Sequence, residues 1–178
     1  MKSCFIGDMK VIQYFGNVLW STPDYKTIVK ESTPGAVEFY KRWNMKGHNG
    51  WDVVPADVYD MGRIYSFYAG VIVGIVLNHP DYGNGLRIYI PELQVVEYHN
   101  HMKWLSAEAK LLLDIRSKFF IGQMGSTGAS IGAHDHIAFA KVDKTCFDKN
   151  GILKIGKDNR LNEDNGYLGY INPAPYIG

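Results

Sequence analysis

The stretch Ile121-Gly-Gln-Met-Gly-Ser-Thr-Gly-Ala-Ser-Ile-Gly-Ala-His-Asp-His136 runs directly into Ile137-Ala-Phe-Ala-Lys-Val142 and decides the fold. The apolar residues after His136 predict a strand. Because side chains alternate along a strand, His134 and His136 are expected on one face and Asp135 on the other. Two imidazoles on one face can serve one metal ion, or one can bind the metal while the other handles protons. A pair of partly buried histidines with ordinary hydrogen bonds is the alternative.

The glycines between positions 122 and 132 give this stretch unusual backbone freedom. A glycine-rich loop can cradle phosphate, but this one lacks the G-K-[ST] ending, so no lysine would reach a phosphate group. The glycines are therefore predicted to allow sharp backbone bends beside a metal cleft.

Two further histidine patterns precede this stretch. In Gly47-His-Asn-Gly-Trp-Asp52, a turn at Asn49-Gly50 would bring an imidazole and a carboxylate toward one point, and both groups are zinc ligands in proteins. In Tyr98-His-Asn-His-Met102, alternation at the end of a strand places His99 and His101 on one face. Either pattern alone is typical of solvated surface residues.

Taken together, the three patterns favour an open zinc site. A catalytic zinc takes three protein ligands and a water molecule, whereas a structural zinc takes four protein ligands. Neither of the two cysteines, Cys4 and Cys146, belongs to a histidine pattern, which disfavours a zinc ribbon or finger. The spacing also excludes an H-E-x-x-H helix.

Elsewhere, β-branched and alternating residues dominate the middle of the chain. Strands are predicted at 70–77 (buried on both faces), 86–90 and 94–98, with a tight turn at Asn84-Gly85 and a break at Pro91. Helices are predicted from Pro34 to about Trp43, capped by Thr33, and across 107–115, capped by Ser106. Neither helix carries a recognisable catalytic pattern. The tail from 143 onward, rich in Gly, Asn and Asp, is predicted to be an extended wrap or a flexible end.

Length and composition predict one globular domain over residues 1–178, with 46% hydrophobic and 21% charged residues. A net charge of +1 gives no reason to expect a nucleic-acid partner. The apolar run 67–77 is too short for a membrane-spanning helix, and Asp8 and Lys10 interrupt any signal peptide. We therefore expect a soluble protein without a secretory route of its own. Its two cysteines are expected as free thiols, with a bridge between them as the alternative.

In this order, the motifs resemble those of the M23 (lysostaphin/LytM-type) zinc endopeptidases of peptidoglycan. That family's pattern is H-x-G-x-D, then a strand-end H-[LM], then a glycine- and serine-rich stretch ending in H-x-H. It is matched by His48-Asn-Gly-Trp-Asp52, by His101-Met102 and by the stretch from 121 to 136. Tyr82-Gly-Asn84 is similar to the family's Y-G-N turn, and Ile12-Gln-Tyr-Phe-Gly16 to its opening strand.

The resemblance covers roughly residues 11–142, which would form the core of a single M23-like domain, with 143–178 as a C-terminal extension. It implies a mainly β fold: an antiparallel sheet with an open substrate groove and one or two short helices. It also implies that His48, Asp52 and His136 bind Zn²⁺. His101 and His134 would be the unligated catalytic pair that activates water and stabilises the tetrahedral intermediate.

The sequence departs from the family at several positions. Asp135 replaces a bulky apolar residue, Ile137 replaces a frequent aromatic one, and the segment 20–46 is long. Because alternation directs Asp135 toward core residues, we expect it to reach solvent or to pair with a donor. The expected donors are a backbone N–H of the preceding loop, a Lys or an Arg, which would make Asp135 a brace for the Gly128 to Gly132 turn. His99 is an extra histidine without an assigned role.

The function implied by the resemblance is zinc-dependent hydrolysis of peptide bonds in bacterial peptidoglycan. The alternative is a non-catalytic, metal-containing structural or wall-binding module, such as a virion component, that keeps the fold. A metal-dependent hydrolase with a substrate outside the wall is a third reading. Action at the cell wall without a signal peptide leaves three routes open: a phage virion, release through a holin, or excision from a longer protein.

Overall fold

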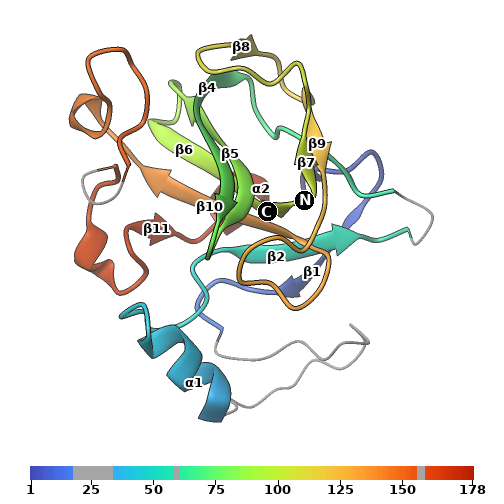
Figure 1. The fold of residues 1–178 in the computed structure, drawn as a ribbon, viewed down its shortest axis with the longest axis vertical. Helices are drawn as coiled ribbons and strands as arrows, with labels where there is room; N and C mark the ends of the chain where they lie inside the picture. The colour runs from blue at the N-terminus through green and yellow to red at the C-terminus, as the bar shows by residue number, and fades with distance from the viewer. Residues whose placement is uncertain (18–33, 58–60, 156–158) are drawn as a thin grey trace.

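The computed structural model describes residues 1–17, 34–57, 61–155 and 159–178, and β-strands dominate these ranges (Figure 1). One sheet has the strand order β1-β2-β10-β6-β5-β4-β8, with β11 paired to β10, and every pairing in it is antiparallel. Its strands are β1 (Met9–Gln13), β2 (Trp51–Pro55), β4 (Gly70–His79), β5 (Gly83–Ile90), β6 (Val95–Met102), β8 (Asp114–Ile115), β10 (Asp135–Lys141) and β11 (Tyr170–Ile171).

A smaller antiparallel sheet has the order β3-β9-β7 and consists of β3 (Arg63–Tyr65), β9 (Phe120–Gln123) and β7 (Trp104–Leu105). Two short helices, α1 (Pro34–Lys41) and α2 (Ala174–Ile177), complete the regular structure together with two single turns of 3-10 helix. The predicted fold class, a mainly β antiparallel domain with one or two short helices, is confirmed.

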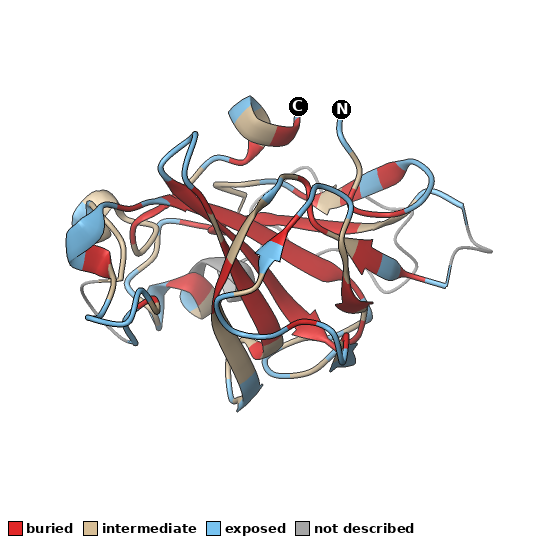
Figure 2. Ribbon diagram, turned by 90° about the horizontal axis from the view of Figure 1, so that it is seen from above, coloured by how far each residue is buried: buried red, intermediate tan, exposed pale blue. Residues whose placement is uncertain are grey.

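Apolar side chains cover both faces of the central strands, which appear as the buried centre of the molecule in Figure 2. All eight residues of β6 are buried, as are the first six of β10. One face packs Ile88, Ile137 and Phe139 into the larger core. The opposite face, with Tyr98 and Ala138, is covered by C-terminal residues. The predicted metal ligand His136 therefore lies on the best-packed pair of strands.

The predicted strands at 86–90, 94–98 and 137–142 correspond to β5, β6 and β10. The strand at 70–77 is also present, as β4, but it is wrongly predicted as buried on both faces, since Leu77 is 62% exposed. The predicted turn at Asn84-Gly85 is wrong, because both residues belong to β5. The chain turns just before them, and Gly83 adopts a positive φ of 64°.

The predicted second helix, across 107–115, does not form. This segment folds into turns and the short strand β8, and part of its backbone bonds to β4. Leu112 donates its N–H to the carbonyl of Ile72, whose own N–H bonds to the carbonyl of Leu113. The edge of β4 thus captures the backbone groups that a helix would have used internally.

The first predicted helix is present as α1, with proline in its first turn; its predicted cap, Thr33, lies outside the described residues. The tail after 142 is a wrap that packs on the sheet and ends beside the N-terminus, where Lys2 N–H bonds to the carbonyl of Ile177 (Figure 1). Cys4 and Cys146 are free and buried. Within the described ranges, no helix is long and apolar enough to cross a membrane.

Candidate metal centre

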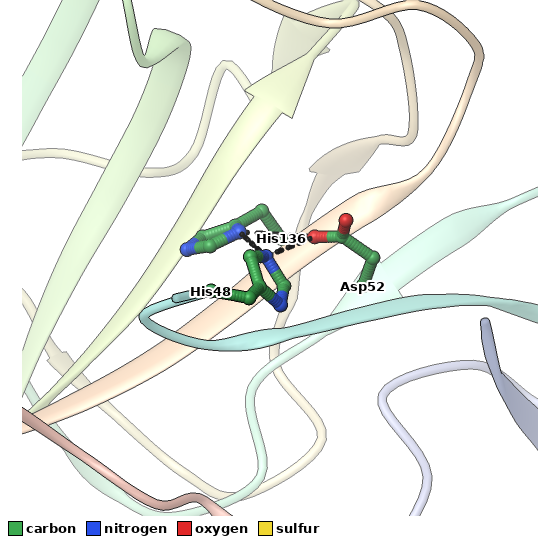
Figure 3. Close-up of side chains that lie close together, drawn as sticks. All are labelled: His48, Asp52 and His136. Carbon is green, nitrogen blue, oxygen red and sulfur yellow. Dashed lines mark hydrogen bonds and ion pairs between the residues drawn. The ribbon is translucent and has the colours of Figure 1, made fainter. Parts of the chain in front are cut away.

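Strand pairing brings His136 and Asp52 together. The two residues are direct partners across the β10–β2 pair, and His48 lies in the loop that leads into β2. His136 Nδ1 is 2.9 Å from Asp52 Oδ1 and 3.0 Å from His48 Nε2, and His48 Nε2 is 3.1 Å from Asp52 Oδ1 (Figure 3). Three ligand-type atoms therefore converge on one point, and they belong to the three residues that the M23 resemblance implies as zinc ligands.

Gly50, between His48 and Asp52, is required for this convergence. A Cβ at this position would lie 2.4 Å from the carbonyl oxygen of Ile137 and 2.7 Å from His136 Nε2. The loop can approach the His136 ring this closely only because position 50 has no side chain. The spacing His-x-Gly-x-Asp thus places His48 and Asp52 on the two sides of Gly50, and Gly50 is the point where this loop packs closely against the His136 ring.

The donor set fits one metal ion. All three residues are 5–9% exposed, and within the described ranges they form the one group of three or more His, Cys, Asp or Glu side chains that could hold a metal. Ligands at about 2.0–2.1 Å from a tetrahedral zinc lie about 3.3 Å apart. The three separations near 3 Å are therefore close to those of three corners of such a tetrahedron, with a fourth corner left for solvent or substrate.

His101 and His134 are beside this group, with ring centroids 4.9 Å apart. His134 Nε2 is 3.4 Å from Asp52 Oδ1, and the His101 ring is 5.8 Å from that of His136. His101 Nδ1 is 2.8 Å from the carbonyl oxygen of Thr127, and His134 Nδ1 is 2.8 Å from that of Gly132. A carbonyl can only accept, so each Nδ1 carries a hydrogen. Nε2 of each ring then holds a lone pair when the ring is neutral and a second hydrogen when it is charged.

The electrostatic environment differs sharply between these groups. Burial alone would raise the pKa of Asp52, but the charges of His48 and His134 hold it well below its usual value. Burial, reinforced by the charges of His134 and His136, lowers the pKa of His101 to about 3. Burial acts in the same direction on His134, but the Asp52 carboxylate overrides it and raises the pKa to about 9 in the metal-free site. Burial lowers the pKa of His136.

The prediction that His99 and His101 share a face is wrong. His101 has a positive φ of 61°, which breaks the alternation of β6 and turns its side chain toward His134 and His136. Non-glycine residues rarely adopt this conformation, and such residues cluster at functional sites. His99 keeps the regular orientation and points to the other face of the sheet, where its ring stacks 6.0 Å from that of Phe67.

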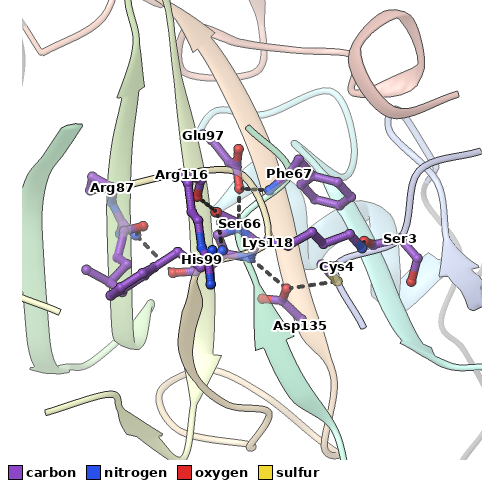
Figure 4. A network of polar contacts seen from close by, with 12 residues as sticks. Ser3, Cys4, Ser66, Phe67, Arg87, Glu97, His99, Arg116, Lys118 and Asp135 are labelled. Atoms are coloured by element: carbon purple, nitrogen blue, oxygen red, sulfur yellow. Dashed lines mark hydrogen bonds and ion pairs between the residues drawn. The ribbon is translucent and has the colours of Figure 1, made fainter. Parts of the chain in front are cut away.

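On that other face, His99 pairs with Asp135, so two departures from the family pattern meet in one contact (Figure 4). His99 Nδ1 is 2.7 Å from Asp135 Oδ2, and His99 Nε2 is 2.7 Å from Glu97 Oε1. The thiol of Cys4 also donates to Asp135 Oδ2, at 3.7 Å. All four side chains are fully buried. Burial alone would lower the pKa of His99, but the carboxylate of Asp135, followed by that of Glu97, raises it to about 10.

Asp135 points away from the ligand-type atoms, as predicted, but the expected donors are wrong. Its partners are His99 and Cys4, not a loop N–H, a Lys or an Arg, so it braces β6 against β10 and not the glycine turn. Sequence reasoning missed Glu97 and Cys4 because nothing local marks them: Cys4 is 131 residues from Asp135. For Glu97, the sequence holds one indication: it alternates with His99 onto one side of a strand.

A cavity of about 360 Å³ opens over the five predicted site residues. The predicted glycine bends line one side of it, with Gly128, Ser130 and Gly132. The other side is lined by aromatic and apolar residues that sequence reasoning did not assign to the site, namely Phe39, Tyr40, Trp43 and Met45. Gln13 Nε2 donates to the Tyr40 hydroxyl at 2.6 Å and thereby ties the end of α1 to β1.

Solved structures with this fold include peptidase domains. A mutant catalytic domain of the prophage-encoded M23 protein EnpA from Enterococcus faecalis is similar at a TM-score of 0.52 and 20% identity, over 74% of this chain and 80% of that one. The catalytic domain of the antimicrobial peptidase lysostaphin from Staphylococcus simulans gives 0.52 and 16%, over 74% and 80%. LytU gives 0.50 and 19%, over 72% and 71%. The chain therefore has the fold of M23 peptidase domains, as its motifs predicted. No protein-family model and no curated protein matches the sequence.

Proposed function

We propose that this chain is an M23-type zinc endopeptidase that hydrolyses peptide bonds in bacterial peptidoglycan. The observation that carries the proposal is the convergence of five residues on one cavity: three ligand-type side chains and two further histidines with Nε2 free of carbonyl partners. The fold shared with the catalytic domains of lysostaphin and EnpA supports a peptidase, and the resemblance to M23 motifs supports peptidoglycan as its substrate class. A likeness of fold alone does not carry function, so the site has to carry it.

His48 Nε2, Asp52 Oδ1 and His136 Nδ1 would hold the zinc ion. Two neutral imidazoles and one carboxylate form the donor set of many catalytic zinc sites, which keep the fourth position open. When bound, zinc would lower the pKa of its water molecule to about 7, and the metal ion would also polarise the substrate carbonyl. The depressed pKa of Asp52 keeps that ligand in the charged form that a metal requires.

His101 and His134 would move the proton and hold the developing oxyanion. Each ring is oriented by a carbonyl at Nδ1, which fixes the tautomer and leaves Nε2 to accept a proton from the attacking water. The ring that has been protonated can then return this proton to the leaving amine. The other ring can donate to the tetrahedral oxyanion as an imidazolium, the form that also carries a hydrogen on Nε2.

The main alternative is a module that keeps the fold and the metal without turnover. Its basis in the sequence was Asp135, a carboxylate next to a ligand. Asp135 lies on the opposite face of β10, paired with His99, so it leaves the ligand set undisturbed. This favours the catalytic proposal over the structural one. A hydrolase acting outside the wall differs only in substrate, and the experiment below separates it.

The test combines zinc analysis of the purified protein with release of fragments from purified peptidoglycan, with and without a chelator. We expect about one zinc per chain and chelator-sensitive release. His136→Ala should lose both zinc and activity, whereas His101→Ala and His134→Ala should keep zinc and lose at least about 100-fold in rate. His79→Asn, which changes a histidine outside the group, is the control. Near-wild-type rates in both His101→Ala and His134→Ala would exclude the proposed roles.

Action on peptidoglycan places the protein at the bacterial cell wall. A virion-associated enzyme, a holin-released enzyme and a domain excised from a longer protein remain the three proposed routes. Detecting the protein in purified phage particles, or only in lysing cells, separates the first two.

A further inference from the structure

The side of the cavity formed by α1 and the loop after it is an aromatic wall, defined by Phe39, Tyr40, Trp43 and Met45. The rings of Phe39 and Trp43 pack edge to face with centroids 4.6 Å apart, and those of Phe39 and Tyr40 at 5.4 Å. These contacts hold the rings as one surface. All four wall residues belong to the long segment 20–46, which is one of the departures from the family pattern.

The wall adjoins the reacting centre. The Tyr40 ring lies 6.2 Å from that of His48, so a group resting on the wall sits within one residue of any bond held at the metal centre. Across the cavity, Ala129 and Ile131 from the glycine-rich loop form an apolar lip, and Ile131 is 74% exposed. The aromatic wall and this lip both give the cavity apolar atoms that an alkyl chain could contact.

Apart from the histidines, the ionisable side chains with a formal charge that line the cavity are acidic. Its lining includes the carboxylates of Asp52 and Asp81, and no Lys or Arg is among the described residues that line it. Away from the metal ligands, a long side chain that ends in an ammonium group would therefore meet the Asp81 carboxylate and no Lys or Arg, while an acidic side chain would meet a like charge. Aromatic faces also attract cations.

Building on the proposed peptidase function, we infer that the aromatic wall is a specificity subsite. It selects substrates with a long aliphatic side chain, of the lysine type, on the residue beside the scissile bond. A glycine at that position would leave the wall and the lip facing each other across water, and the peptide would lose the apolar contact that fixes its position. Trp43 and Ile131 are the residues expected to set this preference.

The test uses internally quenched hexaglycine and matched peptides in which one norleucine or lysine, in L or D form, is moved through the six positions. We expect one position beside the cleaved bond where norleucine and lysine both raise kcat/KM at least about tenfold over hexaglycine. Trp43→Ala and Ile131→Ser should each reduce that ratio to below about threefold. Ile131 is exposed, so its variant tests the wall independently of any folding defect in Trp43→Ala.

Trp104→Ala is the matched control, because Trp104 is 45% exposed and packs on Phe120, away from the cavity lining. It should keep the wild-type ratio. Hexaglycine cleaved as well as every substituted peptide, or an unchanged ratio in both Trp43→Ala and Ile131→Ser, would overturn the inference. Peptidoglycan digestion without cleavage of any substituted peptide would also overturn it while leaving the proposed function intact. Failure to bind zinc or to digest peptidoglycan at all would refute the proposed function itself.

Discussion

His99→Leu should destabilise the protein more than any change at its partner Asp135. In the folded protein the imidazolium of His99 lies between two buried carboxylates, those of Asp135 and Glu97, at 2.7 Å from each. The Asp135 and Glu97 carboxylates outweigh burial and raise the pKa of His99 from 6.5 to about 10. At about 1.36 kcal/mol per pH unit, this difference sets an upper limit of about 5 kcal/mol on the stabilisation of the charged ring. Breaking a buried ion pair typically costs about 3–5 kcal/mol.

The double variant gives the decisive comparison. Asp135→Leu leaves His99 paired with Glu97, so we expect it to cost only about 1–3 kcal/mol. His99→Leu leaves both carboxylates buried without a cation, so we expect the full 3–5 kcal/mol. Adding Asp135→Leu to His99→Leu removes one of these two uncompensated charges. The double variant should therefore be more stable than His99→Leu alone, which is the opposite of additive behaviour.

Urea unfolding at pH 7, followed by circular dichroism and tryptophan fluorescence at one fixed zinc concentration, measures all four proteins. The zinc concentration must be constant because bound metal itself contributes to apparent stability. Equal slopes in urea would show that the variants unfold to the same extent. The reasoning is refuted if His99→Leu costs less than about 1 kcal/mol, or if the double variant is less stable than His99→Leu.

Three further predictions follow from features of the same structure. Because the pKa of His99 is raised to about 10, the stabilisation of the folded protein by the charged ring is complete below pH 6.5 and is lost as the pH rises through 10. Urea midpoints should therefore decline from pH 6 to 10, and they should decline much less in His99→Leu. Removing the metal with a chelator should lower Tm by about 5–10 °C, as binding at 100 times Kd contributes about 2.7 kcal/mol, and added zinc should restore it in a thermal melt. Gly83→Ala should cost at least about 1–3 kcal/mol in a urea titration, because position 83 has a φ of 64° and a Cβ there would lie 2.2 Å from Thr127 Oγ1. The same variant should reduce kcat, since the Thr127 carbonyl orients His101; unchanged kcat would argue against that positioning.

Much of the sheet could be predicted from sequence because it depends on short-range patterns. The grouping of His48, Asp52 and His136 was implied by the resemblance to M23 motifs. Alternation in β10 correctly separated His134 and His136 from Asp135. In His48-Asn-Gly-Trp-Asp52, the Asn49-Gly50 pair correctly indicated that the chain bends between His48 and Asp52. These inferences require only a few consecutive residues and the pleat of one strand.

The errors arose where distant backbone or one unusual dihedral decides the outcome. The helix predicted after Ser106 was lost to the edge of β4, a neighbour that local propensity cannot reveal. The orientation of His101 depends on a positive φ that no side-chain pattern encodes. The partners of Asp135 come from β6 and from the first residues of the chain. The aromatic wall was missed because its residues have the ordinary composition of an amphipathic helix, and only tertiary packing directs them into the cavity.

The hydrogen bond between Lys2 and Ile177 also makes the chain suitable for ring closure. With the two ends side by side, a linker of a few residues would join them without displacing either strand or helix (Figure 1). Closing a loop of this length lowers the conformational entropy of the unfolded chain by an amount worth up to about 5 kcal/mol. A cyclic form could then be reopened at an exposed turn remote from the cavity, such as the one at Glu92–Leu93, to give a permuted chain with new ends for attaching other domains.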